Sequence, residues 1–301
     1  MTSPPSPTND AAPRRDGFAL RVLASGSRGN CSVLVSGGSP RRVTLIDAGL
    51  SPSRTRRHLA DVGILPHEVD DIVFTHLDSD HCHPGWVSAL RGRLWHARVR
   101  LLHRHRGRAE RMGMLTSPTE LFDEDGFELG ATRAHPVVMA HDSLGVAAFR
   151  FALDSDAGVA ELGFATDVGR VTSGLIEHMR GVGVLAIESN YCPQLQQSSG
   201  RPAFLKRRIM GGSGHLSNQE CADAVARIEP REHVVFLHLS QECNRPALVS
   251  AEHAGGDVAF TISDQHRPTR WVPIPALPPV ARTAPVVTGN LFTQSRPGSV
   301  A

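Results

Sequence analysis

The chain has 301 residues, of which 40% are hydrophobic, and it contains no run of about 18 apolar residues. This length can bury one large core or two modest ones, and the composition excludes a membrane-spanning helix. The 32 basic and 30 acidic residues give a formal net charge of +2, so net charge alone does not argue for a nucleic-acid or membrane partner.

Two segments poor in regular apolar patterns flank the central part of the chain. Residues 1–16 contain four prolines and few apolar residues, so we expect a disordered N-terminal lead. Residues 265–301 contain seven prolines, and we expect an extended tail that lies on the folded body at Trp271–Pro275. Residues 17–264 show no internal repeat and no linker, which predicts a single domain.

Cysteine usage and the first residues bear on the compartment. The first residues lack the apolar segment of a secretory signal. The five cysteines are odd in number, widely spread and free of CxxC pairs, which fits a reducing compartment better than a disulfide framework. We therefore expect a cytoplasmic protein. The sequence indicates no protein partner.

In chain order, the central part is rich in strands at first and then alternates strands with helices. The strands are recognised by alternating or short apolar runs that end at Gly, Ser or Pro. They are predicted at 18–25, 31–36, 42–47, 70–76, 98–103, 135–141, 147–153, 161–167, 184–189 and 233–238, with helices at 51–63 and 216–229. Several strands end in His or Asp, so we expect a layered α/β protein with a site at one edge of its sheets.

The densest group of chemically active side chains is the segment THLDSDH, residues 75–81, which follows a buried strand. His76 and Asp78 share one side of an extended chain, whereas Asp80 and His81 come after a turn and can point to a second position. This layout suits two adjacent cations better than one tetrahedral zinc. A solvated loop, the ordinary alternative, would be an odd place for two carboxylates and two imidazoles.

Four ligands on one loop cannot complete two coordination shells, so other strand ends must supply the remainder. The candidates are His141, Asp167 and His238, each of which follows an apolar run. A single histidine at a strand end is more often a hydrogen-bonded surface residue than a ligand. Three further histidines are assigned to that class: His103, His135 and His233.

The segment THLDSDH resembles the HxHxDH signature of the metallo-β-lactamase superfamily. Further segments occur in the order seen in its YycJ/WalJ-like branch: LASGSRGN (23–30), LIDAGLS (45–51), HD (141–142), TDVG (166–169), ESNY (188–191), LKRRI (205–209), GHLSN (214–218) and HLSQECN (238–244). The resemblance covers residues 23–246. It implies a four-layer αββα sandwich in one α/β domain at 17–264, a two-metal hydrolytic site, and cleavage of phosphodiesters, with DNA as the leading substrate.

The resemblance also implies a ligand for each position of two divalent metals, which would be zinc, manganese or magnesium. One metal would be held by His76, Asp78 and His141, the other by Asp80, His81 and His238, with Asp167 between them. The nucleophile would be a bridging water or hydroxide.

Roles outside the ligand set follow from the same resemblance. Catalytic roles would fall to Asp80, Asp167 and His215, the last as a proton donor to substrate or leaving group, although a structural histidine is nearly as common there. Asp47 would support the metal loop from behind. Substrate binding would involve Asn30, Lys206, Arg207, Arg208 and Asn218, although asparagines in Gly/Ser loops are more often turn residues.

Asp78 departs from the family pattern, which usually has a second histidine at this position. The extra carboxylate would make a cluster of two metals and one hydroxide neutral, whereas histidine would leave it positive. Oxygen in place of nitrogen also favours manganese or magnesium over zinc. We therefore expect Asp78 to lower the preference for zinc, unless its side chain points away from the metals.

Two basic segments bear on the choice of substrate. Residues 91–111 contain eight arginines, which form either a phosphate-binding surface or a solvated face, and Lys206–Arg208 is a second cluster. The alternative function is a small-molecule metallohydrolase (a lactonase, thioesterase or cyclic-nucleotide phosphodiesterase), because the same metals serve all of these reactions. A non-catalytic metal-binding protein is less favoured, since the ligand set is intact. Arginines that border the metals would favour the nuclease.

Overall fold

The structure, a computed structural model, describes residues 17–38, 41–92, 94–115, 118–141 and 143–278. The predicted N-terminal lead and the end of the predicted tail lie outside the described residues. No helix in the described ranges combines the length and the apolar character needed to cross a bilayer.

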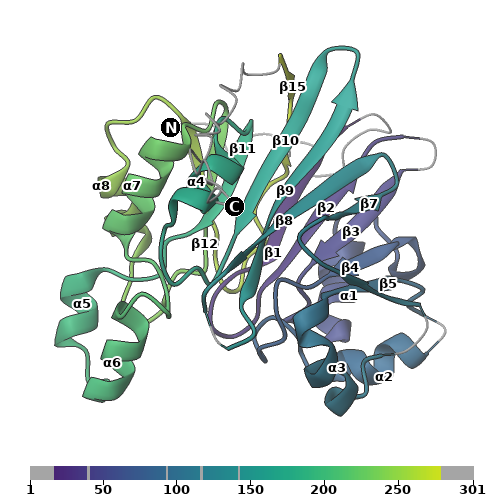
Figure 1. The fold of residues 1–301 in the computed structure, drawn as a ribbon, viewed down its shortest axis with the longest axis horizontal. Helices are drawn as coiled ribbons and strands as arrows, with labels where there is room; N and C mark the ends of the chain where they lie inside the picture. Colours follow the sequence, from purple (N-terminus) through teal and green to yellow (C-terminus); the bar gives the residue numbers. More distant parts are fainter. Residues whose placement is uncertain (1–16, 39–40, 93, 116–117, 142, 279–301) are drawn as a thin grey trace, which may run out of the picture.

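Two sheets form the centre of the molecule (Figure 1). The first has the strand order β14-β1-β2-β3-β4-β5-β6, and the second has the order β13-β12-β11-β10-β9-β8-β7 with β15 paired to β10. The first sheet comprises β1 (Ala19–Ala24), β2 (Cys31–Ser36), β3 (Arg42–Ile46), β4 (Asp71–Val73), β5 (Arg98–Leu102), β6 (Thr119–Phe122) and β14 (Val272–Pro273). The second comprises β7 (Phe127–Leu129), β8 (Thr132–Met139), β9 (Val146–Ser155), β10 (Gly158–Ala165), β11 (Val184–Glu188), β12 (His233–Leu237), β13 (Ala259–Ile262) and β15 (Ala276–Leu277).

Helices cover the outer face of each sheet. The first sheet carries α1 (Pro52–Ala60), α2 (Gly85–Arg91) and α3 (Arg106–Met112), and the second carries α4 (Ser173–Met179), α7 (Asn218–Ile228) and α8 (Pro246–Glu252). Two further helices, α5 (Pro193–Ser198) and α6 (Ala203–Met210), project from one end of the body in Figure 1. Short 3-10 turns occupy Pro66–Glu68 and His103–His105.

Three layers of apolar side chains separate the four layers of secondary structure. Leu59 of α1 and Trp86 of α2 pack against the first sheet, whereas Leu20 of β1 and Phe149 of β9 meet between the two sheets. Ile228 of α7 belongs to a third cluster, against the second sheet. Because each sheet buries both of its faces, the chain forms the predicted αββα sandwich.

Local sequence explains the boundaries of the best-defined helices. Ser51 caps α1 by accepting a hydrogen bond from the Arg54 amide, and Pro52 occupies the first turn. Ser217 and Glu220 form a reciprocal capping box at the start of α7. The stop signal at Gly63 is less accurate, because α1 already ends at Ala60.

The direction of the strands determines where the functional side chains meet. Strands β3, β4, β5 and β6 run parallel in the first sheet, as do β10, β11 and β12 in the second. Strand β8 shares the direction of β10, because both are antiparallel to β9. The carboxyl ends of β4, β8, β10 and β12 therefore lie along one edge of the sandwich.

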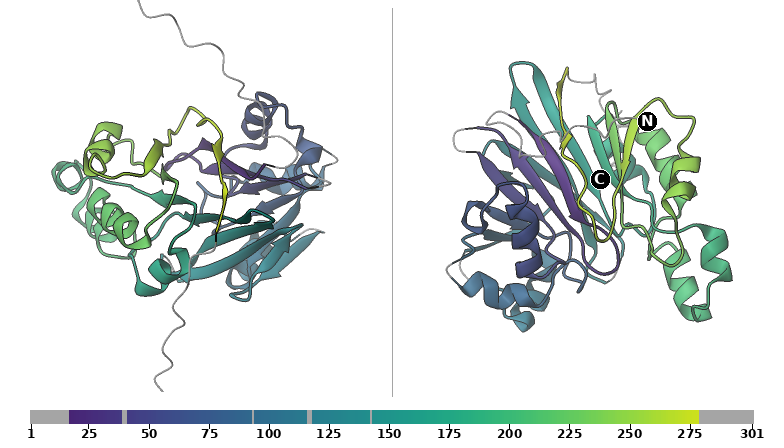
Figure 2. Two further views of the ribbon diagram at one scale, coloured as in Figure 1. Left: turned by 90° about the horizontal axis from the view of Figure 1, so that it is seen from above. Right: turned by 180° about the vertical axis from the view of Figure 1, so that it is seen from behind.

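The first part of the predicted tail pairs with the folded body. The sequence analysis placed Trp271–Pro275 on that body; within this stretch Val272 pairs with Leu20 of β1, and beyond it Ala276 pairs with Ala160 of β10. Figure 2, seen from behind, shows this yellow segment beside the purple N-terminal strands. Strands β14 and β15 have two residues each, and β14 ends in Pro273, so neither shows the alternation that signals a strand.

Candidate metal centre and its cavity

The sandwich edge brings together the candidate ligands from four strands and one loop. His76 follows β4, His141 follows β8, Asp167 follows β10 and His238 follows β12. The loop after β4 adds three more: Asp78, Asp80 and His81. The seven residues proposed from sequence as metal ligands therefore converge, although they are spread over more than half of the chain.

One half of this cluster surrounds the Asp80 and Asp167 carboxylates. His81 Nε2 lies 3.3 Å from Asp167 Oδ2 and 3.8 Å from Asp80 Oδ2. His238 Nε2 lies 3.5 Å from Asp80 Oδ2, and its Nδ1 lies 2.7 Å from Asp167 Oδ1. Atoms of these four residues lie close enough together to bind one metal ion.

The other half shares Asp167. His76 Nε2 and His141 Nε2 lie 3.5 Å and 3.7 Å from Asp167 Oδ2. Asp78 Oδ2 approaches the same two imidazole nitrogens, at 3.9 Å and 4.0 Å. Asp167 is therefore the one side chain that both halves have in common, as a residue between two metals must be.

The donor set fits metal ions on an observation independent of spacing. Among the described residues, His76 Nε2 and His238 Nε2 are buried side-chain nitrogens without a hydrogen-bond partner. A buried polar atom left in this state is costly unless something binds it. Three carboxylates and four imidazoles, the ligands that zinc and manganese share, surround these atoms.

Asp47 orients His81 from behind the loop. His81 Nδ1 donates to Asp47 Oδ2 at 2.7 Å, which leaves Nε2 facing the cluster. Asp47 also accepts hydrogen bonds from the Thr75 amide and hydroxyl. Burial opposes charge on His81, but the carboxylates of Asp167 and Asp47 outweigh it and hold the pKa of His81 well above its usual value.

Charge is distributed unevenly among the remaining ligands. Burial, with the neighbouring His81, holds the pKa of His76 well below its usual value. Burial alone would raise the pKa of Asp167, but His238 and His81 outweigh it and hold that pKa well below the usual range. Asp167 is consequently an anion, and His76 offers an uncharged nitrogen, which are the states in which both bind metals.

Three residues at this edge adopt left-handed backbone conformations. The φ angles of Asp47, Asp167 and His238 are 60°, 54° and 56°; Asp47 and His238 directly follow a strand, and Asp167 follows β10 after one intervening residue. Asp and His tolerate this region better than most residues with a side chain, at a cost of about 1–3 kcal/mol each. The turn directs each side chain across the edge instead of along the sheet.

Glu188, which the sequence analysis did not select, supports His215. Glu188 Oε1 accepts a hydrogen bond from His215 Nδ1 at 2.6 Å, and its Oε2 accepts one from the Val168 amide. The carboxylate is fully buried and lies 3.4 Å from His238 Nδ1. Glu188 ends the apolar run VLAI, so the rule that selected Asp167 and His238 would have found it.

A cavity of about 310 Å³ opens over the candidate ligands. Its lining includes five of the candidate ligands and His215: Asp78, Asp80, His141, Asp167 and His238. It also includes four residues of α6 and the segment just before it: Arg201, Leu205, Arg208 and Ile209. Two arginines not paired with these carboxylates therefore face the same space as the candidate metal ligands.

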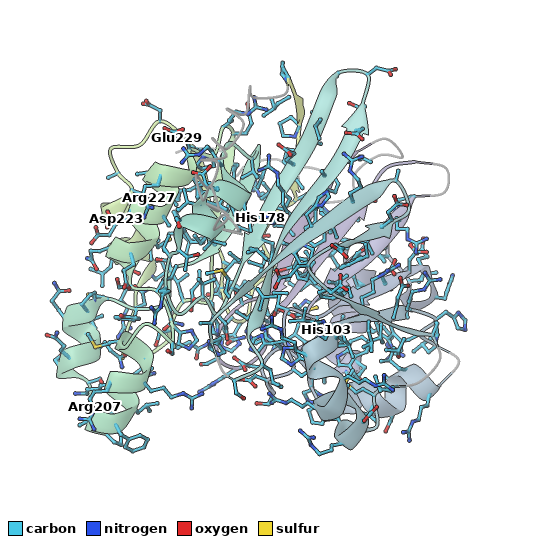
Figure 3. All side chains as sticks on the ribbon, viewed as in Figure 1. His103, His178, Arg207, Asp223, Arg227 and Glu229 are labelled. Carbon is cyan, nitrogen blue, oxygen red and sulfur yellow. The ribbon has the colours of Figure 1, made fainter. Side chains whose placement is uncertain are left out.

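The basic run Lys206–Arg208 divides between two surfaces. Arg208 lines the cavity, whereas Lys206 and Arg207 border a separate hollow on the other side of α6. Lys206 Nζ donates to the carbonyl of Gln197 at 2.6 Å. Arg207 lies at the outer end of the projecting helices in Figure 3. Of the three, only Arg208 is placed to contact a substrate at the ligand cluster.

The two asparagines proposed to bind phosphate are buried. Asn30 accepts hydrogen bonds from Ser25 Oγ and the Gly26 amide, and its amide nitrogen lies 3.0 Å from His81 Nε2. Asn218, the first residue of α7, bonds to Ser189 and Asn244, and only 1% of it is exposed. Neither side chain is among those that line the cavity, so phosphate binding by either one stays a prediction.

Asp78 points toward the cluster, and an arginine forms an ion pair with its carboxylate. Asp78 Oδ1 accepts a hydrogen bond from Arg108 Nη1 at 2.7 Å, and both side chains are about one-third exposed. The expectation of a less positive site counted only metal ligands and hydroxide. The Arg108 guanidinium is a positive charge beside them that this expectation left out, and the preference of the site among metals stays a prediction.

The three histidines set aside from the ligand set lie elsewhere. His103 and His135 are exposed, and His233 Nε2 lies 2.9 Å from Thr261 Oγ1. None of them lines the cavity over the cluster. Figure 3 labels His103 on the side of the molecule that carries α3.

Comparisons with known proteins identify relatives of this chain. Residues 41–239 match the family model described as a beta-lactamase superfamily domain. The chain is 30% identical over 240 residues to exodeoxyribonuclease WalJ of Streptococcus pneumoniae serotype 2, covering 76% of this chain and 84% of that protein. It is 26% identical to exodeoxyribonuclease YycJ of Bacillus anthracis, covering 77% and 86%. The solved metallo-beta-lactamase fold protein YhfI of Bacillus subtilis superimposes with a TM-score of 0.60 at 13% identity, covering 83% of this chain and 99% of that one.

Proposed function

This chain belongs to the metallo-β-lactamase superfamily, and on that premise we propose that it is a two-metal phosphodiesterase that degrades DNA. The coarser statement, that it is a metal-dependent hydrolase, follows from its family and its relatives. The observation that carries the finer one is the position of Arg208, which lines the same cavity as Asp167. A guanidinium facing a metal cluster is suited to a phosphate.

The proposal assigns the ligands as two sets joined by Asp167. His76, Asp78 and His141 would hold one metal, and Asp80, His81 and His238 would hold the other. The metals, zinc or manganese, with magnesium as a further candidate, would supply an activated water and stabilise charge on the phosphoryl group. The chain itself fixes the two positions, through the strand ends and through Asp47 behind His81.

We propose that His215 donates a proton to the leaving oxygen. Glu188 accepts the hydrogen bond of His215 Nδ1, which leaves Nε2 available on a side chain that lines the cavity. A buried carboxylate behind an imidazole fixes the tautomer and the orientation of the ring, as a proton donor at a fixed position requires. A purely structural histidine would not need its second nitrogen to face the cavity.

The residues of α6 that line the cavity suggest that the substrate is the end of a DNA strand. A cavity of about 310 Å³ accommodates roughly one nucleotide, and so it favours attack at the end of a strand. Phe204, whose side chain is 67% exposed, precedes Arg208 by four residues and so lies on the same side of α6. An exposed aromatic ring beside an arginine can stack on an unpaired base while the arginine binds the adjacent phosphate.

The test is digestion of end-labelled DNA by metal-loaded protein. Single- and double-stranded DNA labelled at the 5′ or the 3′ end is incubated with manganese-, zinc- or magnesium-loaded enzyme, beside RNA of the same sequence. We expect mononucleotides to be released progressively from one end of the DNA. Hydrolysis of a lactone or thioester while DNA stays intact with every metal would support the small-molecule alternative instead.

Two matched histidine variants distinguish a role of His215 as general acid from a role in folding. His215→Gln is expected to lower kcat on DNA by about 10²-fold or more, because the leaving oxygen loses its proton donor. His233→Gln, at a strand start away from the cavity, should leave kcat unchanged. A DNA substrate with a better leaving group should partly restore the activity of His215→Gln, which damage to folding would not allow.

A further inference from the structure

The α5–α6 segment, residues 193–210, differs from the rest of the chain in its charge. No aspartate or glutamate occurs in the sequence between Glu188 and Glu220, the stretch that contains both helices. The whole chain has 30 acidic residues, so this stretch departs clearly from the average composition. It nevertheless contains four cations: Arg201, Lys206, Arg207 and Arg208. The projecting helices in Figure 1 therefore form a cationic surface.

Three of these four cations are not neutralised by an acidic side chain from elsewhere in the fold. Arg201 forms an ion pair with Glu242. Lys206 donates to the carbonyl of Gln197, an uncharged acceptor. Neither it nor Arg207 or Arg208 forms an ion pair within the part of the chain that the structure describes. The surface of α6 therefore keeps a positive potential, which a polyanion would neutralise.

Helix α6 separates two hollows. Arg208 lines the cavity over the candidate ligands, whereas a second hollow of about 460 Å³, here called the outer hollow, lies on the other side of the helix. The outer hollow is lined by Gln197, Lys206, Arg207, Met210 and Gly211. The exposed Phe204 precedes Arg207 by three residues and Arg208 by four, so its ring lies one turn before both arginines.

The cavity over the candidate ligands is too small for more than the end of a polynucleotide. At about 310 Å³ it holds roughly one nucleotide, so the nucleotides behind that one must lie on the protein surface. A helix with its side chains is about 10–12 Å across, and stacked nucleotides advance about 3.4 Å each, so about three or four nucleotides span α6. The outer hollow is therefore within reach of a strand whose end lies in the cavity.

We propose that the outer hollow is a second nucleotide-binding subsite, which holds the unpaired strand behind the end that is cleaved. The proposal rests on the nuclease proposed above and adds the length of strand that the protein recognises. Arg207 binds a phosphate, and the apolar parts of Lys206 and Met210 form a surface for a base. An acidic polypeptide would match the charge but has no bases for Phe204 and Met210, so these two residues favour nucleic acid.

The experiment compares DNA strands of different length. Single-stranded oligonucleotides of three to twelve nucleotides with the same terminal sequence are given to metal-loaded wild type and to the double variant Lys206→Gln/Arg207→Gln. We expect the wild-type kcat/KM to rise about ten-fold from three nucleotides to about six and then to level off, because the strand then reaches the outer hollow. The double variant should lose most of this rise. Damage to folding would lower kcat/KM at every length alike and leave the ratio between lengths unchanged.

Three single variants control for other effects of the substitutions. Arg207→Gln leaves the hydrogen bond between Lys206 and the Gln197 carbonyl intact, and it should lower the ratio between long and short strands by about three-fold. Arg207→Lys keeps a cation at the outer hollow and should retain most of the ratio. Arg227→Gln removes an exposed arginine from α7, away from Arg207 in Figure 3, and should keep the wild-type ratio.

Binding without cleavage separates this inference from the proposed function. Fluorescence anisotropy gives the affinity of the metal-free protein for the labelled twelve-nucleotide strand, with polyglutamate as a competitor. Tighter binding by the wild type than by the double variant, without cleavage by any metal-loaded form, would support the subsite and remove the proposed function. Cleavage with the same length ratio in both proteins would overturn the subsite alone. Displacement of the strand by polyglutamate as effectively as by unlabelled DNA would assign the surface to an acidic protein and overturn the inference.

Discussion

The two arginine-rich segments of this protein, 91–111 and 201–208, are similar in sequence and different in their surroundings. In the first, Arg98, Arg100, Arg104, Arg106 and Arg108 each contact an acidic side chain. In the second, Arg201 contacts Glu242, whereas no acidic partner occurs for Arg207 or Arg208 within the described ranges. Arginine content therefore does not predict a phosphate-binding surface; the acidic neighbours in space decide it.

The comparison would fail most clearly if the cavity that Arg208 lines were not the catalytic centre. Asp167→Ala tests this, because it removes the side chain shared by both candidate metal positions. We expect turnover of DNA to fall by about 10³-fold or more and the bound metal to fall below two ions. Metal analysis and a nuclease assay on the same preparation measure both. Full activity with two bound ions would place the chemistry elsewhere.

A direct comparison of one arginine from each segment gives the next largest effect. Arg208→Ala should raise KM for DNA by about ten-fold, because it removes a guanidinium from the wall of the cavity. Arg104→Ala removes an exposed arginine that contacts Glu124, and it should leave KM unchanged. Steady-state kinetics on one labelled oligonucleotide measure both. Equal losses in the two variants would mean that segment 91–111 also binds the substrate.

Salt dependence sharpens the comparison with a smaller effect. Each phosphate contact adds about 0.9 to the slope of log affinity against log salt on duplex DNA, and somewhat less on single strands. Arg208→Ala should lower the magnitude of that slope by about 0.9, the value of one phosphate contact. Arg207→Ala, at the outer end of α6, should lower it less. Binding measured with the catalytically inactive Asp167→Ala background avoids degradation of the probe. A slope of zero in the parent would contradict nucleic-acid binding.

The smallest expected effect concerns a third group of arginines, around His58 on α1. Burial and the nearby Arg54 and Arg57 lower the pKa of His58, although Asp61 opposes them, and its two ring nitrogens have no hydrogen-bond partner in the described residues. As the pH falls below about 6.5, the unfolded chain binds a proton that the folded His58 refuses, so folding stability falls. His58→Gln should make the loss of stability between about pH 7.5 and about pH 5.5 smaller, as measured by urea unfolding of metal-free protein. An identical pH dependence in both proteins would show that His58 is not the cause.

Sequence patterns were sufficient for the strands that carry the site and insufficient for contacts between distant segments. The runs before His76, His141, Asp167 and His238 are apolar and end abruptly, so they indicate both a strand and a side chain at its end. The ion pair of Arg108 with Asp78 joins residues 30 positions apart and leaves no local signal. Charge counted along the chain could not reveal that a cation offsets Asp78.

Short or irregular elements were also beyond the sequence patterns. Strands β6 and β7 have four and three residues, too few to show a period. Helix α5 begins at Pro193 and α6 follows Pro202, and neither helix has a side-chain cap. Their positions depend on packing: Ile209 of α6, for example, is buried against Tyr191 and Cys243. The wall of the cavity that carries Arg208 therefore depends on tertiary contacts that no short sequence window contains.

The pairing of the C-terminal strands has a consequence for synthesis of the protein on the ribosome. Strand β1 emerges early, but one of its edges stays open until residues 269–274 arrive, when Thr269 and Ile274 donate to the carbonyls of Val22 and Phe18. The nascent chain therefore carries an unpaired strand edge from the synthesis of β1 until residues 269–274 have been made. A chain truncated after residue 264 would contain every candidate ligand and still expose this edge, so we expect it to aggregate or to be degraded by proteases.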